Sequence, residues 1–368
     1  MDYLTAVKTA IFVFPVIALL FTIPFIIIQY HKYGSVHKFR VLIIYSFILY
    51  LITAYFLVIL PLPSFEEVAK LKTPTMNLIP FSFVVDFIRE SPLVINNPGT
   101  YLKALIHPSF YVVAFNVFLT IPFGMYLRYY YKCSLRKTFL LTFFLSLFFE
   151  LTQLTGLFYI YPRPYRLFDV DDLILNTLGG VVGYMIMGLF SKVLPSRQKI
   201  DEESIKMGTK VSGLRRITVF ILDLVICLVI CLMVSIFTRS NYVMTVTFIF
   251  YYVFVPVIWN GKTLGSNFLR VRFFSPKYMS LKLILRFVLL YLYYYKLPLW
   301  LLTFLISFNN KFAMESDLIL IASLLVIFAI IMYYLITVFL LLKNGKIFYD
   351  KLLGLGCEST IVSEEESA

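Results

Sequence analysis

Charged residues are scarce in this chain. They make up 14% of its 368 residues, whereas hydrophobic residues make up 60%. A water-soluble globular protein carries roughly a quarter charged residues, so the composition excludes that class and indicates an integral membrane protein. The formal net charge is nevertheless +13. In a soluble protein such an excess could indicate nucleic-acid binding, but in a membrane protein it is typical of cytoplasmic loops. We therefore expect no nucleic-acid partner.

Histidine and cysteine are also scarce, which limits the metal chemistry available. The three histidines fall in loops on both sides of the expected membrane, so they cannot form one metal site. The four cysteines fall in predicted cytoplasmic loops or inside one helix, where disulfides are disfavoured. Cys227 and Cys231 share a helix face, but no histidine accompanies them, so small packing residues are the preferred interpretation. We predict no bound metal and no cofactor.

Long hydrophobic runs occupy most of the chain. They predict an all-α fold, a polytopic transmembrane bundle of about nine helices. Each run is close to the ~20 residues that a helix needs to cross a bilayer. The expected helices cover approximately residues 10–30, 41–61, 109–127, 138–157, 172–190, 216–237, 241–259, 287–308 and 317–342.

A polar segment separates these helices into two groups, which predicts two membrane domains. Residues 1–190 would form a five-helix unit, and residues 215–357 a four-helix unit. Residues 191–214 carry mixed charge and no apolar face wide enough to bury, so we expect a cytoplasmic linker there. The acidic tail, residues 358–368, is expected to be disordered.

Lysine and arginine are distributed unevenly between alternate loops. The segments 31–40, 128–137, 191–216, 260–286 and 343–351 hold 23 of them, and the alternate segments hold 9. Cytoplasmic loops are enriched in these residues. We therefore predict a multi-pass protein of the cell membrane, with its N-terminus outside and its C-terminus in the cytoplasm.

The most unusual stretch runs from residue 150 to residue 183, where polar side chains interrupt two apolar helices. Charged groups in or at a bilayer are costly and usually mark a functional site or a contact that locks helix packing. By the distribution of basic residues, this group faces outward. The candidate site residues are Glu150, Gln153, Arg166, Asp169, Asp171, Asp172 and Asn176.

Three glycines, Gly179, Gly180 and Gly183, continue the polar stripe along the same helix. Small residues at this spacing let another helix approach closely. We expect the stripe to pack helix 172–190 against helix 138–157.

The long segment between the second and third helices is too polar to span a membrane. Its apolar stretches, residues 81–88 and 101–106, predict two short helices that lie on the outer membrane interface. We expect them to cover the polar group like a lid.

The spacing of the polar residues resembles the VanZ-like family. The family pattern of Glu-x-x-Gln, then Arg-x-x-Asp-x-Asp-Asp, then Asn-x-x-Gly-Gly-x-x-Gly is present without a gap. Asn77-Leu-Ile-Pro80-Phe81 and Asn116 agree with it, so the resemblance covers about residues 40–190. The founder of that family is linked to low-level resistance to teicoplanin, a lipid-tailed glycopeptide antibiotic. The resemblance implies an envelope protein of a Gram-positive bacterium that lowers susceptibility to such compounds.

Three interpretations of the polar group stay open. It could bind an envelope lipid or lipid-linked amphiphile, with Arg163 and Arg166 on an anionic head group and the carboxylates on a cation or amine. It could be a metal-dependent envelope-lipid enzyme, in which Asp169, Asp171 and Asp172 bind a divalent ion that activates water. It could be structural, with Arg166 paired to Asp169 or Asp172. No histidine or nucleophile lies in the motif, so binding is preferred over catalysis.

A second polar group is expected at the cytoplasmic face. Arg215 and Arg216 open helix 216–237, Asp223 shares a helix face with Arg216, and Asp350 follows the last helix. With the turn Gly261-Lys-Thr-Leu-Gly265, these residues resemble the RDD family over about residues 213–360.

The role of Asp223 leaves two alternatives. An aspartate inside the inner leaflet costs several kcal/mol unless it has a partner, so we expect an ion pair between Asp223 and an arginine. The alternative is a proton- or cation-coupled transporter that uses Asp223. Tyr349 stands where many RDD members have histidine, and this departure weakens the transport interpretation.

Overall fold

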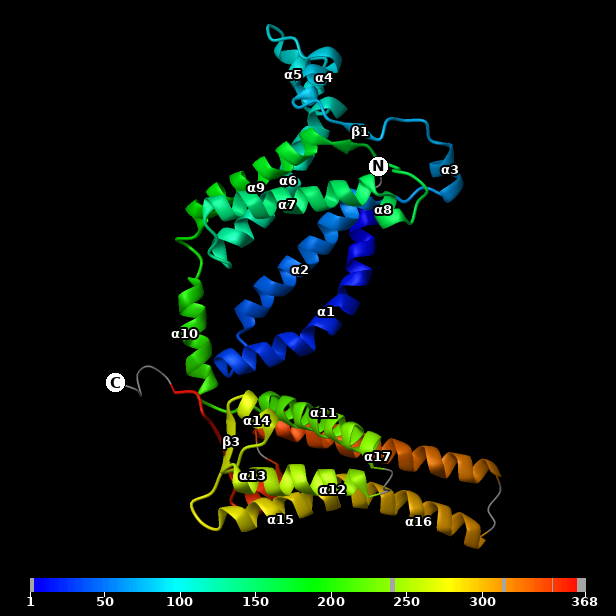
Figure 1. Cartoon of the computed structure of the whole chain (residues 1–368), viewed down its shortest axis with the longest axis vertical. Helices are drawn as coiled ribbons and strands as arrows, with labels where there is room; N and C mark the ends of the chain where they lie inside the picture. The colour runs from blue at the N-terminus through cyan, green and yellow to red at the C-terminus, as the bar shows by residue number, and fades with distance from the viewer. Residues whose placement is uncertain (1–2, 239–241, 313–315, 346, 363–368) are drawn as a thin grey trace. The chain divides into compact units, whose positions relative to one another are not determined.

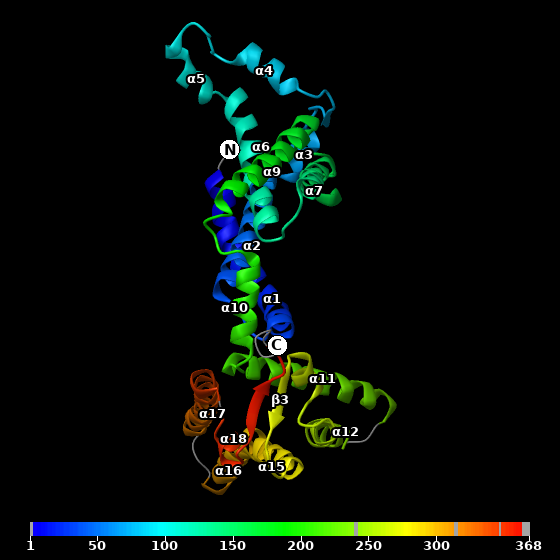
Figure 2. The ribbon, with the colours of Figure 1, turned by 90° about the vertical axis from the view of Figure 1, so that its left-hand side faces the viewer.

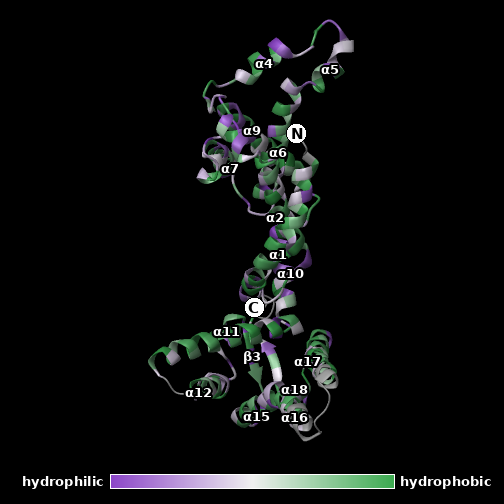
Figure 3. Cartoon of the chain, turned by 90° about the vertical axis from the view of Figure 1, so that its right-hand side faces the viewer, coloured by the Kyte–Doolittle hydropathy of each residue, from purple (hydrophilic) through white to green (hydrophobic). Residues whose placement is uncertain are grey.

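The computed structural model describes residues 3–238, 242–312, 316–345 and 347–362 and is predominantly helical (Figures 1 and 2). Within these residues, eight helices are long and apolar enough to cross a membrane. Their spans are Leu4–Tyr33, Lys38–Ile59, Pro108–Tyr129, Leu135–Leu154, Val170–Phe190, Gly213–Phe237, Met279–Phe304 and Ile321–Lys343. Hydrophobic residues predominate in the long helices of both units (Figure 3). The predicted class, an all-α polytopic membrane protein, is confirmed.

One predicted span, residues 241–259, forms a shorter apolar helix, Val243–Ile258. It consists of α12 (Val243–Ile249), the π-helical segment η2 (Phe250–Phe254) and α13 (Val255–Ile258). Residue 241 lies outside the described residues. The π-helical turn is wider than an α-helical one and often occurs at functional positions.

The chain divides into two compact units. The first unit comprises Met1–Thr22 and Lys38–Ile200, and the second comprises Ile23–His37 and Asp201–Ala368. Helix α1 (Tyr3–Tyr33) therefore contributes to both. Its apolar run continues across the division, so hydropathy alone did not indicate it, although Pro24 lies two residues after Thr22.

The first unit combines long apolar helices with several short ones. The long helices are α2 (Lys38–Ile59), α6 (Pro108–Tyr129), α7 (Leu135–Leu154) and α9 (Val170–Phe190). The short elements are α3 (Phe65–Lys70), α4 (Ser82–Glu90), η1 (Pro98–Thr100), α5 (Tyr101–Leu105), α8 (Gly156–Tyr159), and the parallel strands β1 (Met76–Asn77) and β2 (Phe168–Asp169). Helices α4 and α5 confirm the two short helices predicted at 81–88 and 101–106.

Helix α9 packs along both α6 and α7, and glycines allow the close approach (Figure 1). A Cβ atom at Gly183 would lie 2.0 Å from the carbonyl oxygen of Ile121 on α6, and Gly179 also faces α6. A Cβ atom at Gly180 would lie 2.2 Å from Oγ1 of Thr142 on α7. The prediction that this stripe packs α9 against α7 is therefore wrong for Gly179 and Gly183. It holds for Gly180 because adjacent helical positions face directions about 100° apart.

The second unit contains the remaining helices and an antiparallel strand pair. Its elements after α10 (Arg197–Gly208) are α11 (Gly213–Phe237), α12, η2, α13, α14 (Leu264–Phe268), β3 (Val271–Phe274), α15 (Met279–Tyr291), the π-helical η3 (Leu292–Lys296), α16 (Leu297–Phe312), α17 (Ser316–Asn344), α18 (Phe348–Leu352) and β4 (Gly356–Ser359). Strand β4 pairs with β3 (Figure 2). In this pairing, Phe273 lies opposite Cys357.

The C-terminal segment predicted to be disordered is partly ordered. Glu358 belongs to β4, and its carboxylate accepts hydrogen bonds from the guanidinium of Arg272 on β3. The prediction for residues 358–368 is therefore wrong for 358–362, and residues 363–368 lie outside the described ones. Its acidic composition concealed a strand whose partner is distant in sequence.

The segment predicted as a linker, residues 191–214, contains helix α10. Ile200 on this helix is 1% exposed and packs against Ile43 and Tyr130 in the first unit. The segment was predicted to have no apolar face wide enough to bury, and it nevertheless buries this one side chain. A single isoleucine in a charged sequence makes no periodic pattern, so its burial is visible only in the structure.

Candidate functional sites

Helix α7 carries a polar face towards the beginning of α9. Ser146, Glu150 and Gln153 are spaced at i, i+4 and i+7, which places them on one side of the helix. The carboxylate of Glu150 accepts a hydrogen bond from the backbone N–H of Asp169, 3.0 Å away. Nδ2 of Asn176 donates to Oγ of Ser146 at 3.0 Å. These contacts align the polar faces of α7 and α9.

The polar residues of this region surround one cavity in the first unit. Its volume is about 390 Å³. Six of the seven residues predicted from sequence line it: Glu150, Gln153, Arg166, Asp169, Asp172 and Asn176. Apolar side chains from α2, α6 and α7, among them Leu57, Phe115 and Phe149, complete the wall. We call this space the carboxylate cavity.

Several acceptor atoms of the carboxylate cavity have no donor among the described residues. Oδ1 of Asn176 is buried and unpartnered, and the residue is 3% exposed. Glu150 is 2% exposed and uses only Oε2 in a hydrogen bond. Asp172 accepts one hydrogen bond, from Nδ2 of Asn116 to Oδ1. Buried acceptors normally have partners, so these three residues are the part of the site able to receive a ligand.

The two arginines predicted to meet an anionic head group bind backbone carbonyls. Arg166 donates to the carbonyl oxygens of Val58 and Leu60 at the end of α2, at 2.5 and 2.6 Å. Arg163 donates to the carbonyl oxygens of two residues in the loop after α3, Leu71 and Thr73. The last carbonyls of a helix lack partners within the helix, so Arg166 stabilises the end of α2. These contacts favour a structural role for both side chains.

Asp171, the seventh predicted residue, faces away from the cavity. Its carboxylate accepts hydrogen bonds from the backbone N–H groups of Phe81 and Phe83, at 2.5 and 2.9 Å, and from the hydroxyl of Ser82, at 2.6 Å. Asp171 is 2% exposed. It therefore fixes the beginning of α4 to the beginning of α9.

The carboxylates of the region are not gathered as a metal site. Among the described residues, no group of three or more His, Cys, Asp or Glu side chains is arranged to hold a metal ion. Asp169 accepts from Nδ2 of Asn77 at 3.2 Å, whereas Asp171 faces α4. Divalent cations such as Ca²⁺ and Mg²⁺ need about six or more oxygen ligands around one centre. The predicted metal-dependent interpretation gains no support from this geometry.

In the second unit, Asp223 on α11 is held by neutral donors. It accepts hydrogen bonds from the hydroxyls of Tyr251 and Thr263, both at 2.6 Å, and from the backbone N–H of Gly265, at 2.8 Å. Asp223 is 3% exposed. No arginine forms an ion pair with it among the described residues, so the predicted Asp223–arginine pair is wrong. Instead, Asp223 stabilises the turn that leads into α14.

Buried ion pairs of the second unit are centred on Asp350. This carboxylate accepts hydrogen bonds from Arg216 on α11 and from Nε of Arg286 on α15, the latter at 3.0 Å. Asp350 is 2% exposed. Arg286 was not predicted as a site residue, because the sequence identified it only as one of the basic residues of the cytoplasmic segment 260–286. Its position at the polar end of an apolar helix was the available signal.

Arg215, also predicted in this group, has a separate role. Its guanidinium is fully buried and donates to the carbonyl oxygens of Gly208, Leu269 and Arg270, at 2.8 to 2.9 Å. It thereby joins the beginning of α11 to the end of α14. Adjacent arginines on one helix point in different directions, which explains their different partners.

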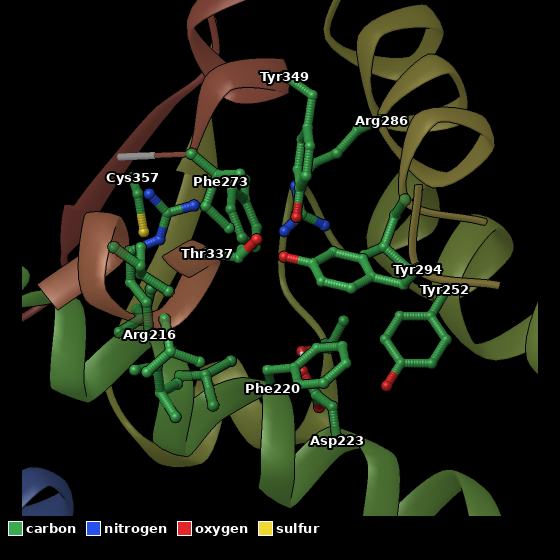
Figure 4. Close-up of a pocket in the computed structure, with 18 of the residues that line it drawn as sticks. Arg216, Phe220, Asp223, Tyr252, Phe273, Arg286, Tyr294, Thr337, Tyr349 and Cys357 are labelled. Atoms are coloured by element: carbon green, nitrogen blue, oxygen red, sulfur yellow. Dashed lines mark hydrogen bonds between the residues drawn. The ribbon is translucent and has the colours of Figure 1, made fainter. Parts of the chain in front are cut away.

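A cavity of about 360 Å³ lies beside these groups in the second unit (Figure 4). Arg216, Asp223, Arg286 and Tyr349 all line it, together with mainly apolar and aromatic side chains. Arg216 and Asp223 thus line one cavity but do not bind each other, because Arg216 pairs with Asp350 and Asp223 accepts from neutral donors. Burial raises the pKa of the Tyr349 hydroxyl, so this residue is neutral at physiological pH and differs in charge from a protonated histidine.

In the part of the chain that the structure describes, eight helices are able to span a membrane, and buried polar residues line a cavity in the first unit. These features define a polytopic membrane protein. Residues 47–191 match the family model described as VanZ/LLP1. The matched range includes every residue that lines the carboxylate cavity. The N-terminal half is therefore similar to membrane proteins of VanZ type. No curated protein and no solved structure matches the chain. The resemblance of the second half to the RDD family stays a prediction.

Proposed function

We propose that this protein acts at the cell envelope as a VanZ-type membrane protein that binds an amphiphile in the carboxylate cavity. The amphiphile is an envelope lipid or a lipid-linked compound in the outer leaflet. By binding it, the protein lowers the susceptibility of a Gram-positive bacterium to lipid-tailed glycopeptides such as teicoplanin. The observation that carries the proposal is the cavity itself, with its polar acceptors on α7 and α9 and its apolar wall from α2, α6 and α7.

The position of the cavity along the helices supports binding at a membrane surface. Glu150 lies four residues before the end of α7, and Asp172 lies in the first turn of α9. At 1.5 Å per residue, both are within about 6 Å of a helix end. An amphiphile can place its polar group at this depth and keep its chain in the bilayer. The distribution of basic residues supports an outward position for this end.

The segment with α4 and α5 supports a lid over the site. Hydrogen bonds of two side chains hold its first part to the cavity region. The carboxylate of Asp171 accepts from the backbone N–H groups of Phe81 and Phe83, and the amide of Asn77 donates to Asp169. Helix α4 exposes apolar side chains such as Val85 and Ile88. Exposed apolar residues on a short helix are typical of an element that lies on a membrane interface.

Antibiotic susceptibility tests this proposal. The chain is expressed in a Gram-positive host that lacks it, and the inhibitory concentrations of teicoplanin and vancomycin are measured. We expect expression to raise the value for teicoplanin more than that for vancomycin. Glu150→Gln and Asp172→Asn should abolish the increase, and Asp86→Asn, at an exposed acidic residue of α4, should retain it. Unchanged susceptibility to both antibiotics, with the protein detected in the membrane, would contradict the proposal.

A transporter centred on Asp223 is the competing function, motivated by the cavity of the second unit that Asp223 lines. The hydrogen bonds of Asp223 to Tyr251, Thr263 and Gly265 favour a structural role instead. Ion flux in proteoliposomes separates the two. Flux that is lost in Asp223→Asn and kept in Asp172→Asn would support transport.

A further inference from the structure

We infer that the carboxylate cavity recognises a primary ammonium group. This inference rests on the proposed function and specifies its ligand. The three acceptors able to receive it are the carboxylates of Glu150 and Asp172 and the amide oxygen of Asn176. A primary ammonium carries three N–H donors and no acceptor, so its hydrogen-bonding capacity matches these groups.

The orientation of the Asn176 amide is fixed by its neighbour. The hydroxyl of Ser146 donates its one proton to the carbonyl oxygen of Asp172, at 3.3 Å. The same hydroxyl must therefore accept the hydrogen bond from Nδ2 of Asn176. This arrangement leaves Oδ1 of Asn176 buried without a donor. An acceptor held in this way favours a ligand that brings an N–H or O–H group.

The charges around the cavity favour a cation. Three carboxylates line it, from Glu150, Asp169 and Asp172, against one guanidinium, that of Arg166. The carboxylate of Asp169 already accepts hydrogen bonds from Nδ2 of Asn77 and from the backbone N–H of Asp171. The two carboxyl groups that keep a free oxygen are therefore those of Glu150 and Asp172, and each is costly to ionise in a buried site without a partner. Buried charges are costly unless they are paired, so a bound cation compensates them.

The size and wall of the cavity favour an amine on an alkyl chain over a bare ion. A volume of about 390 Å³ falls within the range of ligand pockets. Leu57, Val112, Leu119 and the rings of Phe115 and Phe149 offer apolar contact beside the acceptors. A trimethylammonium group has no N–H donors and would leave the acceptors unsatisfied, which a buried polar site penalises. The ligand class is thus a primary-amine amphiphile.

Binding of matched lipids to the purified full chain tests this inference. The probes are short-chain phosphatidylethanolamine and phosphatidylcholine with identical acyl chains, measured by microscale thermophoresis in detergent micelles. We expect phosphatidylethanolamine to bind about tenfold more tightly or better, the effect of losing hydrogen bonds to charged acceptors. Glu150→Gln and Asp172→Asn should each remove this preference, and Asp86→Asn should keep it. Free ethanolamine is measured as a competitor.

The outcomes separate this inference from the proposed function. Equal binding of the two lipids by the native chain overturns the inference, whether or not the variants fold. The inference is also overturned if Glu150→Gln and Asp172→Asn both elute like the native chain in size-exclusion chromatography and still prefer phosphatidylethanolamine. If free ethanolamine competes at concentrations similar to those at which phosphatidylethanolamine binds, the amine comes from a soluble compound. If free ethanolamine does not compete at those concentrations, the amine belongs to a lipid head group. An amine preference without any change in antibiotic susceptibility keeps the inference and contradicts the proposed function. A change in antibiotic susceptibility without an amine preference keeps the proposed function and overturns the inference.

Discussion

At the scale of single residues, the buried carboxylates of this protein differ in how fully they are satisfied. Asp171 accepts three hydrogen bonds and Asp223 accepts three, while Asp350 lies between two guanidinium groups. Glu150 and Asp172 each accept one side-chain or backbone hydrogen bond. Since an unsatisfied buried acceptor lowers stability, the hydrogen bonds of the first group serve folding, whereas the free oxygens of the second group are consistent with the proposed ligand.

Replacing Asp350 with alanine should strongly destabilise the second unit. Arg216 and Arg286 would keep buried positive charges without an anion, which costs about 3–5 kcal/mol of unfolding free energy. The matched control is Glu358→Ala, because its partner Arg272 is 34% exposed and the pair is partly solvated. Exposed pairs contribute about 0–1 kcal/mol. Thermal and denaturant unfolding in detergent micelles measures both. Equal losses in the two variants would contradict a special role for Asp350.

Sequence spacing predicted most of the cavity residues because α7 and α9 are regular helices. Glu150 and Gln153 are one helical turn apart, so their shared face follows from periodicity alone. Asn116, which donates to Asp172 from α6, lies 56 residues away in sequence, and no local pattern connects the two. The same limit applies to Arg286 and Asp350, which are 64 residues apart. Local spacing predicts which residues share a face, but not which helix meets that face.

At the scale of elements, α9 is defined by its two different neighbours. Its Gly179 and Gly183 approach α6 at backbone distance, while Gly180 faces Thr142 of α7. The side chains of Asp172 and Asn176 contact α6 and α7 through Asn116 and Ser146. Small residues and polar residues on one helix therefore hold three helices in the arrangement that forms the cavity. The sequence pattern predicted that α9 packs closely, whereas the identity of the neighbour at each glycine required the structure.

Two glycines of α9 allow a matched test of this packing. A Cβ atom at Gly183 would meet the backbone carbonyl of Ile121 at 2.0 Å, whereas at Gly188 the nearest atoms belong to the flexible side chain of Arg128. Gly183→Ala should therefore lower the unfolding free energy by about 1–3 kcal/mol through overpacking. Gly188→Ala should cost less, because the clash is with the end of a side chain that can shift by giving up its hydrogen bond to the carbonyl oxygen of Tyr184, and because alanine favours helix. Denaturation in micelles compares them. A loss at Gly188 as large as that at Gly183 would refute backbone-limited packing of α6 on α9.

At the scale of the whole molecule, the short apolar helix decides how many times the second unit crosses the membrane. Val243–Ile258 has fewer than 18 residues and extends about 24 Å at 1.5 Å per residue, against about 30 Å for the hydrocarbon core. Arg215 nevertheless donates to the carbonyl oxygens of Leu269 and Arg270. The chain after this helix thus returns to the level at which α11 begins. This contact supports the crossing that hydropathy predicted.

The orientation of the whole chain is a prediction from loop charge, and accessibility of engineered cysteines tests it. Tyr159 is 85% exposed in the turn after α7, and Tyr278 is 75% exposed between β3 and α15. In a chain whose four native cysteines are replaced by alanine, Tyr159→Cys should react with a membrane-impermeant maleimide in intact cells. Tyr278→Cys should react only after permeabilisation, because the segment 260–286 is rich in lysine and arginine. The reverse pattern would put the carboxylate cavity near the cytosolic surface. Its ligand would then have to come from the inner leaflet, and a direct effect on glycopeptides outside the cell would be excluded.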